Sequence, residues 1–166
     1  MRLEGKVCVV TGGATGIGEA SALALAREGA RVVVGDVNVE EGRKTVEDIK
    51  KEGGEALFVE CDVSREEGAR RLVEETVGAF GRIDVLFNNA GINITEGSVP
   101  EMKVEDWRRT FAVNVDGIFW CSRYAIPEMR KNGGGRIINT ASPSSFVGWA
   151  GNAAYIASKG AVMSLT

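Results

Sequence analysis

Five short apolar runs recur along the chain, and each has about the length of one β-strand. Within them Val, Ile and Leu follow one another without alternating polar residues, which is typical of parallel strands covered on both faces. We therefore predict five buried strands. They are placed at Val7–Thr11, Arg31–Gly35, Ala56–Glu60, Ile83–Asn88 and Arg136–Thr140.

The stretches between these runs carry apolar residues at helical spacing. Ser64 and Glu67 form a capping-box pattern that should begin one of the helices. The longest predicted helix runs from about Val104 to Met129, and Pro127 should kink or terminate it. Strands that alternate with helices predict an α/β domain with a doubly wound parallel sheet. No repeat or linker interrupts the pattern, so residues 1–166 should form a single domain.

Composition and charge exclude several classes of function. The 166 residues are 44% hydrophobic and 26% charged, with a net charge of −3, which suits one soluble domain and gives no basic footprint for nucleic acid. No apolar run approaches the length of a membrane helix, and the N-terminal residues do not resemble a signal peptide, so the cytosol is the expected location. There is no histidine, which excludes the Ser-His-Asp triad and the common zinc motifs. Cys8, Cys61 and Cys121 fit neither a metal spacing nor a disulfide framework, so we expect them to be buried and reduced.

A glycine-rich turn follows the first strand and opens an alanine-rich helix, with the sequence Gly12-Gly13-Ala14-Thr15-Gly16-Ile17-Gly18. Such a turn can bind a phosphate through backbone N–H groups and the helix dipole. A nucleoside-triphosphate loop would need lysine where Glu19 stands, so that alternative is disfavoured. Asp36 ends the second strand, where an acid bonds the ribose hydroxyls of a bound dinucleotide. The glycines alone could form an ordinary structural turn, but together with Asp36 they predict a dinucleotide site.

Further motifs complete a resemblance to the short-chain dehydrogenase/reductase family. Asn88-Asn89-Ala90-Gly91 follows the fourth strand, Asn114 lies in the long helix and Ser142 follows the fifth strand. Tyr155 and Lys159 then supply the Tyr-x-x-x-Lys pattern of the family. The resemblance implies a Rossmann-like sheet of strand order 3-2-1-4-5, with the family's final strands lying beyond the residues given.

The resemblance also implies the roles of individual residues. Catalysis would fall to Asn114, Ser142, Tyr155 and Lys159, with Ser142 holding the substrate oxygen and Asn114 holding a water in a proton relay. No metal is implied. The implied cofactor-binding residues are Gly12, Thr15, Gly16, Ile17, Gly18, Asp36, Asp62, Val63, Asn88, Ala90 and Gly91, together with Tyr155 and Lys159.

The Tyr155 and Lys159 side chains should share one face of a helix, because they are four residues apart. A free phenol ionises near pH 10. A lysine ammonium about 4 Å away, at an effective dielectric near 20, would favour the phenolate by roughly 4 kcal/mol. The pair could then exchange a proton with an alcohol or a ketone near neutral pH. The alternative is an interface helix in which Tyr155 packs and Lys159 is solvated.

These residues predict an oxidoreductase that interconverts an alcohol and a carbonyl compound with a nicotinamide cofactor. NAD is expected rather than NADP, because Asp36 would lie against a 2′-phosphate with no basic residue beside it. A dinucleotide-binding module without turnover is the alternative. A secondary alcohol, a 3-oxoacyl thioester, a sugar and a steroid-like substrate all stay open. Phe146 and Trp149 are candidate pocket walls, with packing residues as the equal alternative.

Two expectations concern assembly and chain length. The family usually pairs through its long helix, and that helix is crowded here with Trp107, Phe111, Phe119, Trp120 and Tyr124, so a homo-dimer or homo-tetramer is expected. The final helix, over Ala154–Thr166, shows neither a glycine cap nor a proline. We therefore expect the 166 residues to be the front portion of a longer enzyme. Alone they should be nearly inactive, with some affinity for the adenosine half of NAD.

Overall fold

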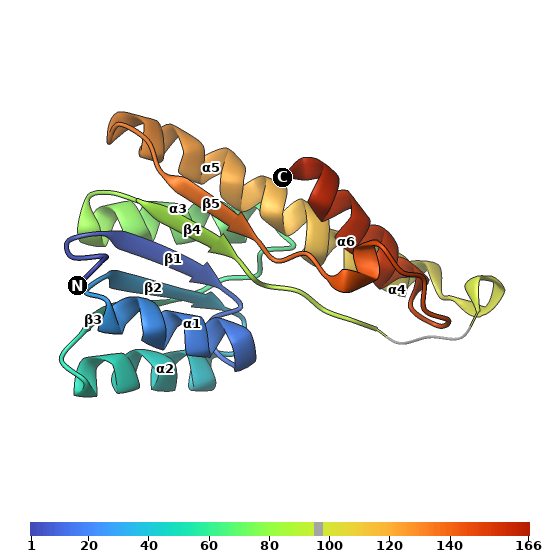
Figure 1. Cartoon of the computed structure of the whole chain (residues 1–166), viewed down its shortest axis with the longest axis horizontal. Coiled ribbons are helices and arrows are strands. Elements are labelled where there is room, and N and C mark those ends of the chain that lie inside the picture. Colours follow the sequence, from blue (N-terminus) through green and yellow to red (C-terminus); the bar gives the residue numbers. More distant parts are fainter. Residues whose placement is uncertain (95–97) are drawn as a thin grey trace.

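The computed structural model describes residues 1–94 and 98–166. Within them, five strands form one sheet of order β3-β2-β1-β4-β5, in which every neighbouring pair is parallel (Figure 1). The predicted sheet and its strand order are confirmed. The strands are β1 (Val7–Thr11), β2 (Arg31–Asp36), β3 (Glu55–Glu60), β4 (Val85–Asn88) and β5 (Arg136–Asn139).

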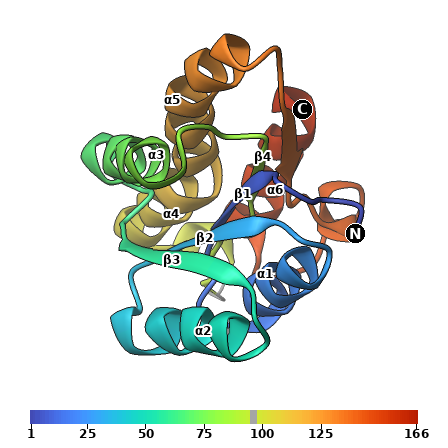
Figure 2. The ribbon, with the colours of Figure 1, turned by 90° about the vertical axis from the view of Figure 1, so that its left-hand side faces the viewer.

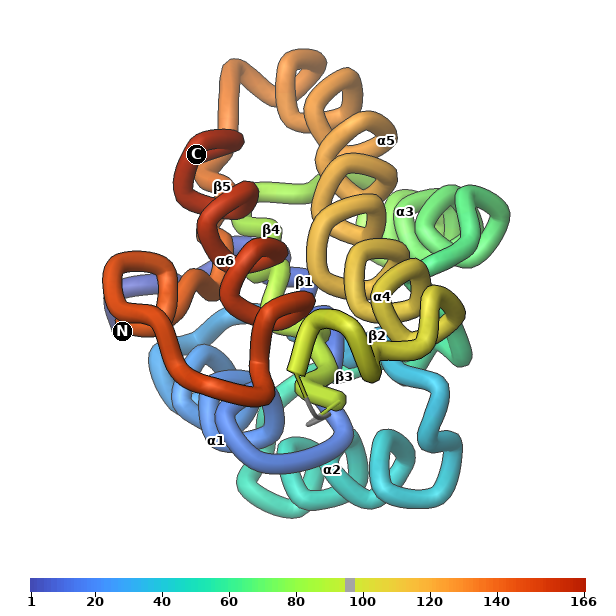
Figure 3. The backbone as a smooth tube through the Cα atoms, turned by 90° about the vertical axis from the view of Figure 1, so that its right-hand side faces the viewer, coloured from blue at the N-terminus to red at the C-terminus, as the bar shows by residue number. Residues whose placement is uncertain are grey.

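The helices cover both faces of this sheet. Figure 2 shows α1 and α2 on one face and α3 and α5 on the other, and Figure 3 shows α6 running beside α4. No helix among the described residues combines the length and the apolar character needed to cross a bilayer. The α-helices are α1 (Gly16–Arg27), α2 (Val39–Lys51), α3 (Glu66–Phe80), α4 (Val104–Phe111), α5 (Gly117–Lys131) and α6 (Ala153–Leu165).

The apolar strand runs build two separate cores, because successive side chains point to opposite faces of a sheet. On β1, Val9 joins the core beneath α3 and α5, whereas Cys8 and Val10 join the core beneath α1 and α2. All three are fully buried. The strands therefore need no polar alternation, which is the pattern that identified them.

The long predicted helix is divided into three parts. A π-helical turn at Ala112–Asp116 separates α4 from α5 and has Asn114 at its centre. Pro127 does not terminate the helix, since α5 continues to Lys131 with this proline inside it. A proline removes only one backbone donor, and α5 is held on both sides of it by Ala125 and Met129, which are buried in the core against α3.

The capping box predicted at Ser64 does not form. The N-cap of α3 is Arg65, without a side-chain cap bond. Ser64 instead donates its N–H and its hydroxyl to one oxygen of Asp62, at 3.0 and 2.6 Å. The carboxylate captures both donors because an aspartate readily bonds the backbone two residues ahead, and this turn competes with the helix cap.

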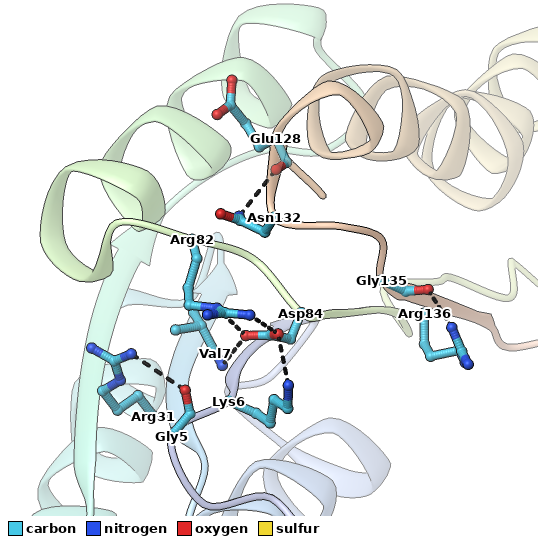
Figure 4. A network of polar contacts seen from close by, with 10 residues as sticks. All are labelled: Gly5, Lys6, Val7, Arg31, Arg82, Asp84, Glu128, Asn132, Gly135 and Arg136. Carbon is cyan, nitrogen blue, oxygen red and sulfur yellow. Dashed lines mark hydrogen bonds and ion pairs between the residues drawn. The ribbon is translucent and has the colours of Figure 1, made fainter. Parts of the chain in front are cut away.

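A buried carboxylate joins the amino ends of β1 and β4 (Figure 4). The side chain of Asp84 is 9% exposed and receives two hydrogen bonds from the Arg82 guanidinium, at 2.6 and 2.8 Å. It also accepts the N–H of Val7 at 3.0 Å and the ammonium of Lys6 at 3.3 Å. This cluster lies at the opposite end of the sheet from the carboxyl ends of the strands, so it stabilises the fold without shaping the cleft described next.

Candidate functional site

A cleft of about 550 Å³ opens at the carboxyl ends of the strands, the end of the molecule to which the arrows in Figure 1 point. In doubly wound α/β sheets ligands bind in this position. Ten of the residues predicted for the site line it: Gly12, Thr15, Ile17, Asp36, Asp62, Val63, Ala90, Gly91, Tyr155 and Lys159.

The glycine-rich turn closes tightly against the loop that follows β4. Gly12 has a φ of +62°, and a Cβ there would lie 2.8 Å from the Cα of Ala90. A Cβ on Gly18 would overlap the carbonyl oxygen of Gly12. Gly16 also has a positive φ, at +58°. Gly16 and Gly18 do not line the cleft, and their part is to let α1 begin directly behind it.

Two residues to which the sequence analysis assigned no role in the site hold this turn in place. The Thr11 hydroxyl accepts the N–H groups of Asn89 and Ala90, both at 3.1 Å. The Asn89 amide donates to the carbonyl oxygens of Thr11 and Gly12, also at 3.1 Å. Asn88 is buried and bonds Asn139 at 2.9 Å, so its side chain joins β4 to β5 and does not face the cleft.

The Asp36 carboxylate is held from two sides by backbone donors. One oxygen accepts the N–H of Ala14 at 3.0 Å, and the other accepts the N–H of Asn38 at 2.9 Å. Each oxygen keeps lone pairs for further donors. A carboxylate fixed in this way at the end of β2 presents two oriented acceptors to the cleft.

Asp62 and Val63 follow β3 and form the neighbouring part of the wall. The two bonds from Ser64 fix one oxygen of Asp62, and the guanidinium of Arg65 lies 3.7 Å from the other. Val63 packs against Gly117 at the start of α5, where a Cβ would lie 3.0 Å from a methyl group of Val63. The turn formed by residues 62–64 therefore lies between α3 and α5.

Tyr155 and Lys159 lie one turn apart on α6 and both line the cleft. The Lys159 residue is only 3% exposed, and its burial lowers the pKa of the ammonium. The Nζ atom donates to the carbonyl oxygen of Thr140 at 2.6 Å and stands 5.7 Å from the centre of the Tyr155 ring. The ammonium is thus directed across the cleft by the end of β5.

The Asn114 side chain is fully buried and bonds three partners. It accepts the N–H of Ile92 at 2.8 Å, and it donates to the Ile92 carbonyl at 2.9 Å and to the Ser158 hydroxyl at 3.0 Å. Ser158 in turn donates to the carbonyl oxygen of Tyr155 at 2.7 Å. Asn114 does not line the cleft. Its amide ties the loop after β4 to the helix that carries Tyr155.

Ser142 begins a single 3₁₀ turn (Pro143–Ser145) after β5, and its hydroxyl oxygen accepts the N–H of Ser144 at 3.1 Å. The O–H hydrogen is left to donate elsewhere. Ser142 is not among the residues that line the cleft. Of the four predicted catalytic residues, the structure therefore brings Tyr155 and Lys159 into the cleft and leaves Ser142 and Asn114 outside its lining.

Several lining residues escaped the sequence analysis. Ile92, Asn93 and Thr140 follow strand ends, and their positions in the loops after β4 and β5 could have identified them. Arg109 and Val113 reach the cleft from α4 and the π-turn, and their spacing of four residues was the available signal. Nothing in the sequence says which face of that helix turns inward.

The described residues fit a dinucleotide. The glycine turn leaves no room for side chains where backbone must approach a phosphate, and the Asp36 carboxylate is fixed at the position that receives ribose hydroxyls. Residues 1–94 and 98–166 contain no group of three or more His, Cys, Asp or Glu side chains placed to hold a metal ion. The predicted cysteines are free and buried, as expected.

Comparison with known proteins gives one consistent family. The sequence model of the short chain dehydrogenase family matches residues 6–166. An uncharacterized oxidoreductase of Thermotoga maritima is 43% identical over 166 residues, which are 100% of this chain and 65% of that protein. Secoisolariciresinol dehydrogenase of Forsythia intermedia is 41% identical, with 99% of this chain and 59% of that protein covered.

Solved structures agree with the sequence relatives. NAD+-bound xylitol dehydrogenase superposes with a TM-score of 0.96 at 39% identity, covering 100% of this chain and 64% of that one. A metagenomic short-chain oxidoreductase in complex with NADP superposes with a TM-score of 0.95 at 38% identity, covering 99% and 75%. The chain thus spans about 60–65% of the length of the curated relatives it matches.

Proposed function

The chain belongs to the short-chain dehydrogenase family, and from this premise we propose that the protein interconverts an alcohol and a carbonyl compound with NAD, using Tyr155 as acid and base. The observation that carries the proposal is the shared cleft. Gly12 of the glycine turn and Asp36 line it together with Tyr155 and Lys159. Residues 1–166 act in this proposal as one dinucleotide-binding domain.

The proposed chemistry divides between binding and proton transfer. When bound, the nicotinamide ring supplies the acceptor or donor of the hydride. The Tyr155 phenolate takes the proton from the alcohol oxygen, and in the reverse direction the Tyr155 hydroxyl donates it to the carbonyl oxygen. Ser142 donates its free O–H hydrogen to the same oxygen and orients it. The Lys159 ammonium stabilises negative charge on the Tyr155 oxygen, since a buried cation acts more strongly than a solvated one.

Asn114 has a positioning part in this proposal. All three of its side-chain bonds go to Ile92 and Ser158, so the amide fixes α6 relative to the loop after β4. A relay water would then be held by backbone around the π-turn, because the side chain has its donors already engaged.

We further propose that NAD is preferred over NADP. The solved relatives include one complex with each cofactor, so the preference is argued from Asp36. Its two oxygens are pinned by Ala14 and Asn38 and cannot turn away from a 2′-phosphate. Two like charges a few ångströms apart cost about 1–4 kcal/mol at the dielectric of a protein surface.

A homo-dimer or homo-tetramer in the cytosol, without a nucleic-acid or membrane partner, completes the proposal. Trp107 on α4 and Phe119 on α5 are both partly exposed, and Phe119 carries the Arg123 guanidinium 5.9 Å from its ring centre. Exposed aromatic groups of this kind are enriched in subunit interfaces. Sedimentation at micromolar concentration measures the assembly, and a monomer would contradict it.

A dinucleotide-binding module without turnover is the second candidate. The position of Ser142 outside the cleft lining favours it, because a binder needs no group to orient a substrate oxygen. The two candidates share the cofactor site and differ only in turnover.

Calorimetric titration of the 166-residue chain with NAD and NADP tests the shared part. We expect NAD to bind more tightly than NADP and Asp36→Asn to narrow the difference, with Asp48→Asn on the exposed face of α2 as the control. Tighter binding of NADP by the unmodified chain would contradict the cofactor assignment. Failure to bind either would contradict both candidates.

A further inference from the structure

One wall of the cleft is formed by a helix that the proposed chemistry does not use. Arg109 and Val113 lie one helical turn apart, on α4 and on the π-turn that follows it, and both line the cleft. The neighbouring aromatic side chains Trp107 and Phe111 stack on each other, with ring centres 4.7 Å apart. The helix therefore places the Val113 side chain, and one turn earlier the Arg109 guanidinium, at the edge of the cleft.

The turn that follows β3 packs beside this helix and suits the edge and face of a flat heterocycle. Asp62, Val63 and Ser64 follow β3, and the Asp62 carboxylate is fixed by its two bonds from Ser64. Val63 is buried, whereas Val37 is exposed at the cleft and offers an apolar surface beside Asp36. This end combines apolar surface with an oriented acceptor, as recognition of an adenine base requires.

The charges along the cleft are unevenly placed. Among the described lining residues only Arg109 and Lys159 are cationic. The Lys159 ammonium is engaged with Thr140 next to Tyr155, whereas Arg109 lies one helical turn from Val113, which packs against the core that contains Val63. The phosphate-binding position lies instead at the glycine turn, on α1.

We propose that the Arg109 guanidinium closes over the face of the bound adenine ring and holds it by a cation–π stack, beside the β3–α3 turn. This inference rests on the proposed dinucleotide site. A guanidinium is planar and weakly hydrated, so it stacks on an aromatic face better than an ammonium does. Because Arg109 is exposed at the mouth of the cleft, it can move over the ring after the dinucleotide has entered.

Arg109 contacts the adenine base in this proposal and does not contact a phosphate group. Adenosine has the base without a phosphate, AMP has both, and nicotinamide mononucleotide has a phosphate without adenine. Titrating the 166-residue chain with these three ligands and with NAD separates the two contacts. Ligand-observed NMR reports the weak binders, and calorimetry reports NAD.

Arg109→Ala is expected to weaken the binding of adenosine, AMP and NAD alike, by about threefold to tenfold, and to leave nicotinamide mononucleotide unchanged. Arg109→Lys keeps the charge but not the planar group, so it should recover little of the loss. Arg108→Ala is the matched control, because Arg108 is the adjacent exposed arginine of α4 and does not line the cleft. It should bind all four ligands as the unmodified chain does.

Three outcomes would overturn the inference, and they are distinguishable. A loss confined to the phosphate-bearing ligands would make Arg109 a phosphate contact. Equal adenosine affinity in Arg109→Ala and the unmodified chain would remove the stack while leaving the dinucleotide site intact. Failure of the unmodified chain to bind NAD and AMP would overturn the proposed function itself, and the stack with it.

Discussion

Replacing Asp84 with asparagine should destabilise the fold without touching the cleft. The substitution keeps the shape but removes the charge that two cations share (Figure 4). It also puts an NH₂ group where one oxygen accepted two donors, so the Arg82 guanidinium loses one bond in either orientation, together with the bond from the Val7 N–H or from the Lys6 ammonium. Asp84 is nearly buried, and its amino-end position ties β1 to β4.

The magnitude follows from the exposure of the partners. A hydrogen bond to a charged group contributes about 1.5–3 kcal/mol, and breaking a fully buried ion pair costs about 3–5 kcal/mol. The Arg82 and Lys6 side chains are 36% and 49% exposed and can be hydrated again once the carboxylate is gone. We therefore expect a loss of about 2–3 kcal/mol in the free energy of unfolding, which lowers Tm by roughly 5–10 °C.

Urea unfolding followed by circular dichroism measures this difference. Asp48→Asn is the control, since its pair with Lys51 lies on the exposed surface of α2 and should contribute nothing measurable. An Asp84→Asn variant that unfolds within about 0.5 kcal/mol of the unmodified chain would refute the reasoning that the buried carboxylate clamps the sheet.

The stabilisation of the fold by the Asp84 carboxylate also depends on pH, and the pKa of the group gives the direction. Burial raises the pKa of Asp84, but the hydrogen bonds from Arg82, Val7 and Lys6 together lower it by more, so the pKa lies below its ordinary value. The stabilisation is therefore present above about pH 4, the ordinary aspartate pKa, and is lost as the pH falls through the lower native pKa. The difference in stability between the unmodified chain and Asp84→Asn should be constant near neutrality and shrink in acid. A difference that grew in acid would contradict this sign.

The remaining predictions concern the glycine turn and the cysteines. Gly18→Ala should abolish NAD binding or folding, because the added methyl group would overlap the backbone oxygen of Gly12, which cannot move aside as a flexible side chain could. Titration measures NAD binding and circular dichroism measures folding. Unchanged NAD affinity would contradict the tight turn. Burial raises the pKa of Cys8 and of Cys61 to about 12, and that of Cys121 still further. At about pH 8 only about one Cys61 thiol in 10⁴ is then a thiolate. A chromogenic disulfide reagent should therefore label none of the three cysteines in the folded chain and all three in denaturant. Rapid labelling of the folded chain would contradict their burial.

The sequence predicted the sheet well because its signal is local. The central strands β1 and β2 are apolar runs buried on both faces, whereas the edge strand β5 is partly exposed. The boundaries also moved, as where β4 begins at Val85 rather than at Ile83. The alternation of strands and helices predicted a doubly wound parallel sheet, and the strand order that the family resemblance implied is confirmed as β3-β2-β1-β4-β5.

The failures of the sequence analysis arise where tertiary contacts decide. Pro127 stays inside α5 because packing against α3 holds the helix on both sides. Ser64 caps nothing because the Asp62 carboxylate competes for its donors. The π-turn at Asn114 reflects bonds to Ile92 and Ser158, which are distant in sequence. Arg109 was missed because spacing alone does not show which face of a helix turns toward a cleft.

The account rests most directly on the proton carried by Tyr155. Tyr155→Phe removes one hydroxyl and keeps the ring, so NAD affinity should stay within about twofold of the unmodified chain. The measurement is NAD-dependent turnover of an alcohol and ketone panel by the unmodified protein and by Tyr155→Phe, made on this chain and on any longer form of it, over a range of pH. In any form of the protein that turns over, we predict a loss of at least about 10²-fold in the variant, whereas residues 1–166 alone should turn over little. Retained turnover in Tyr155→Phe at any pH would contradict this prediction.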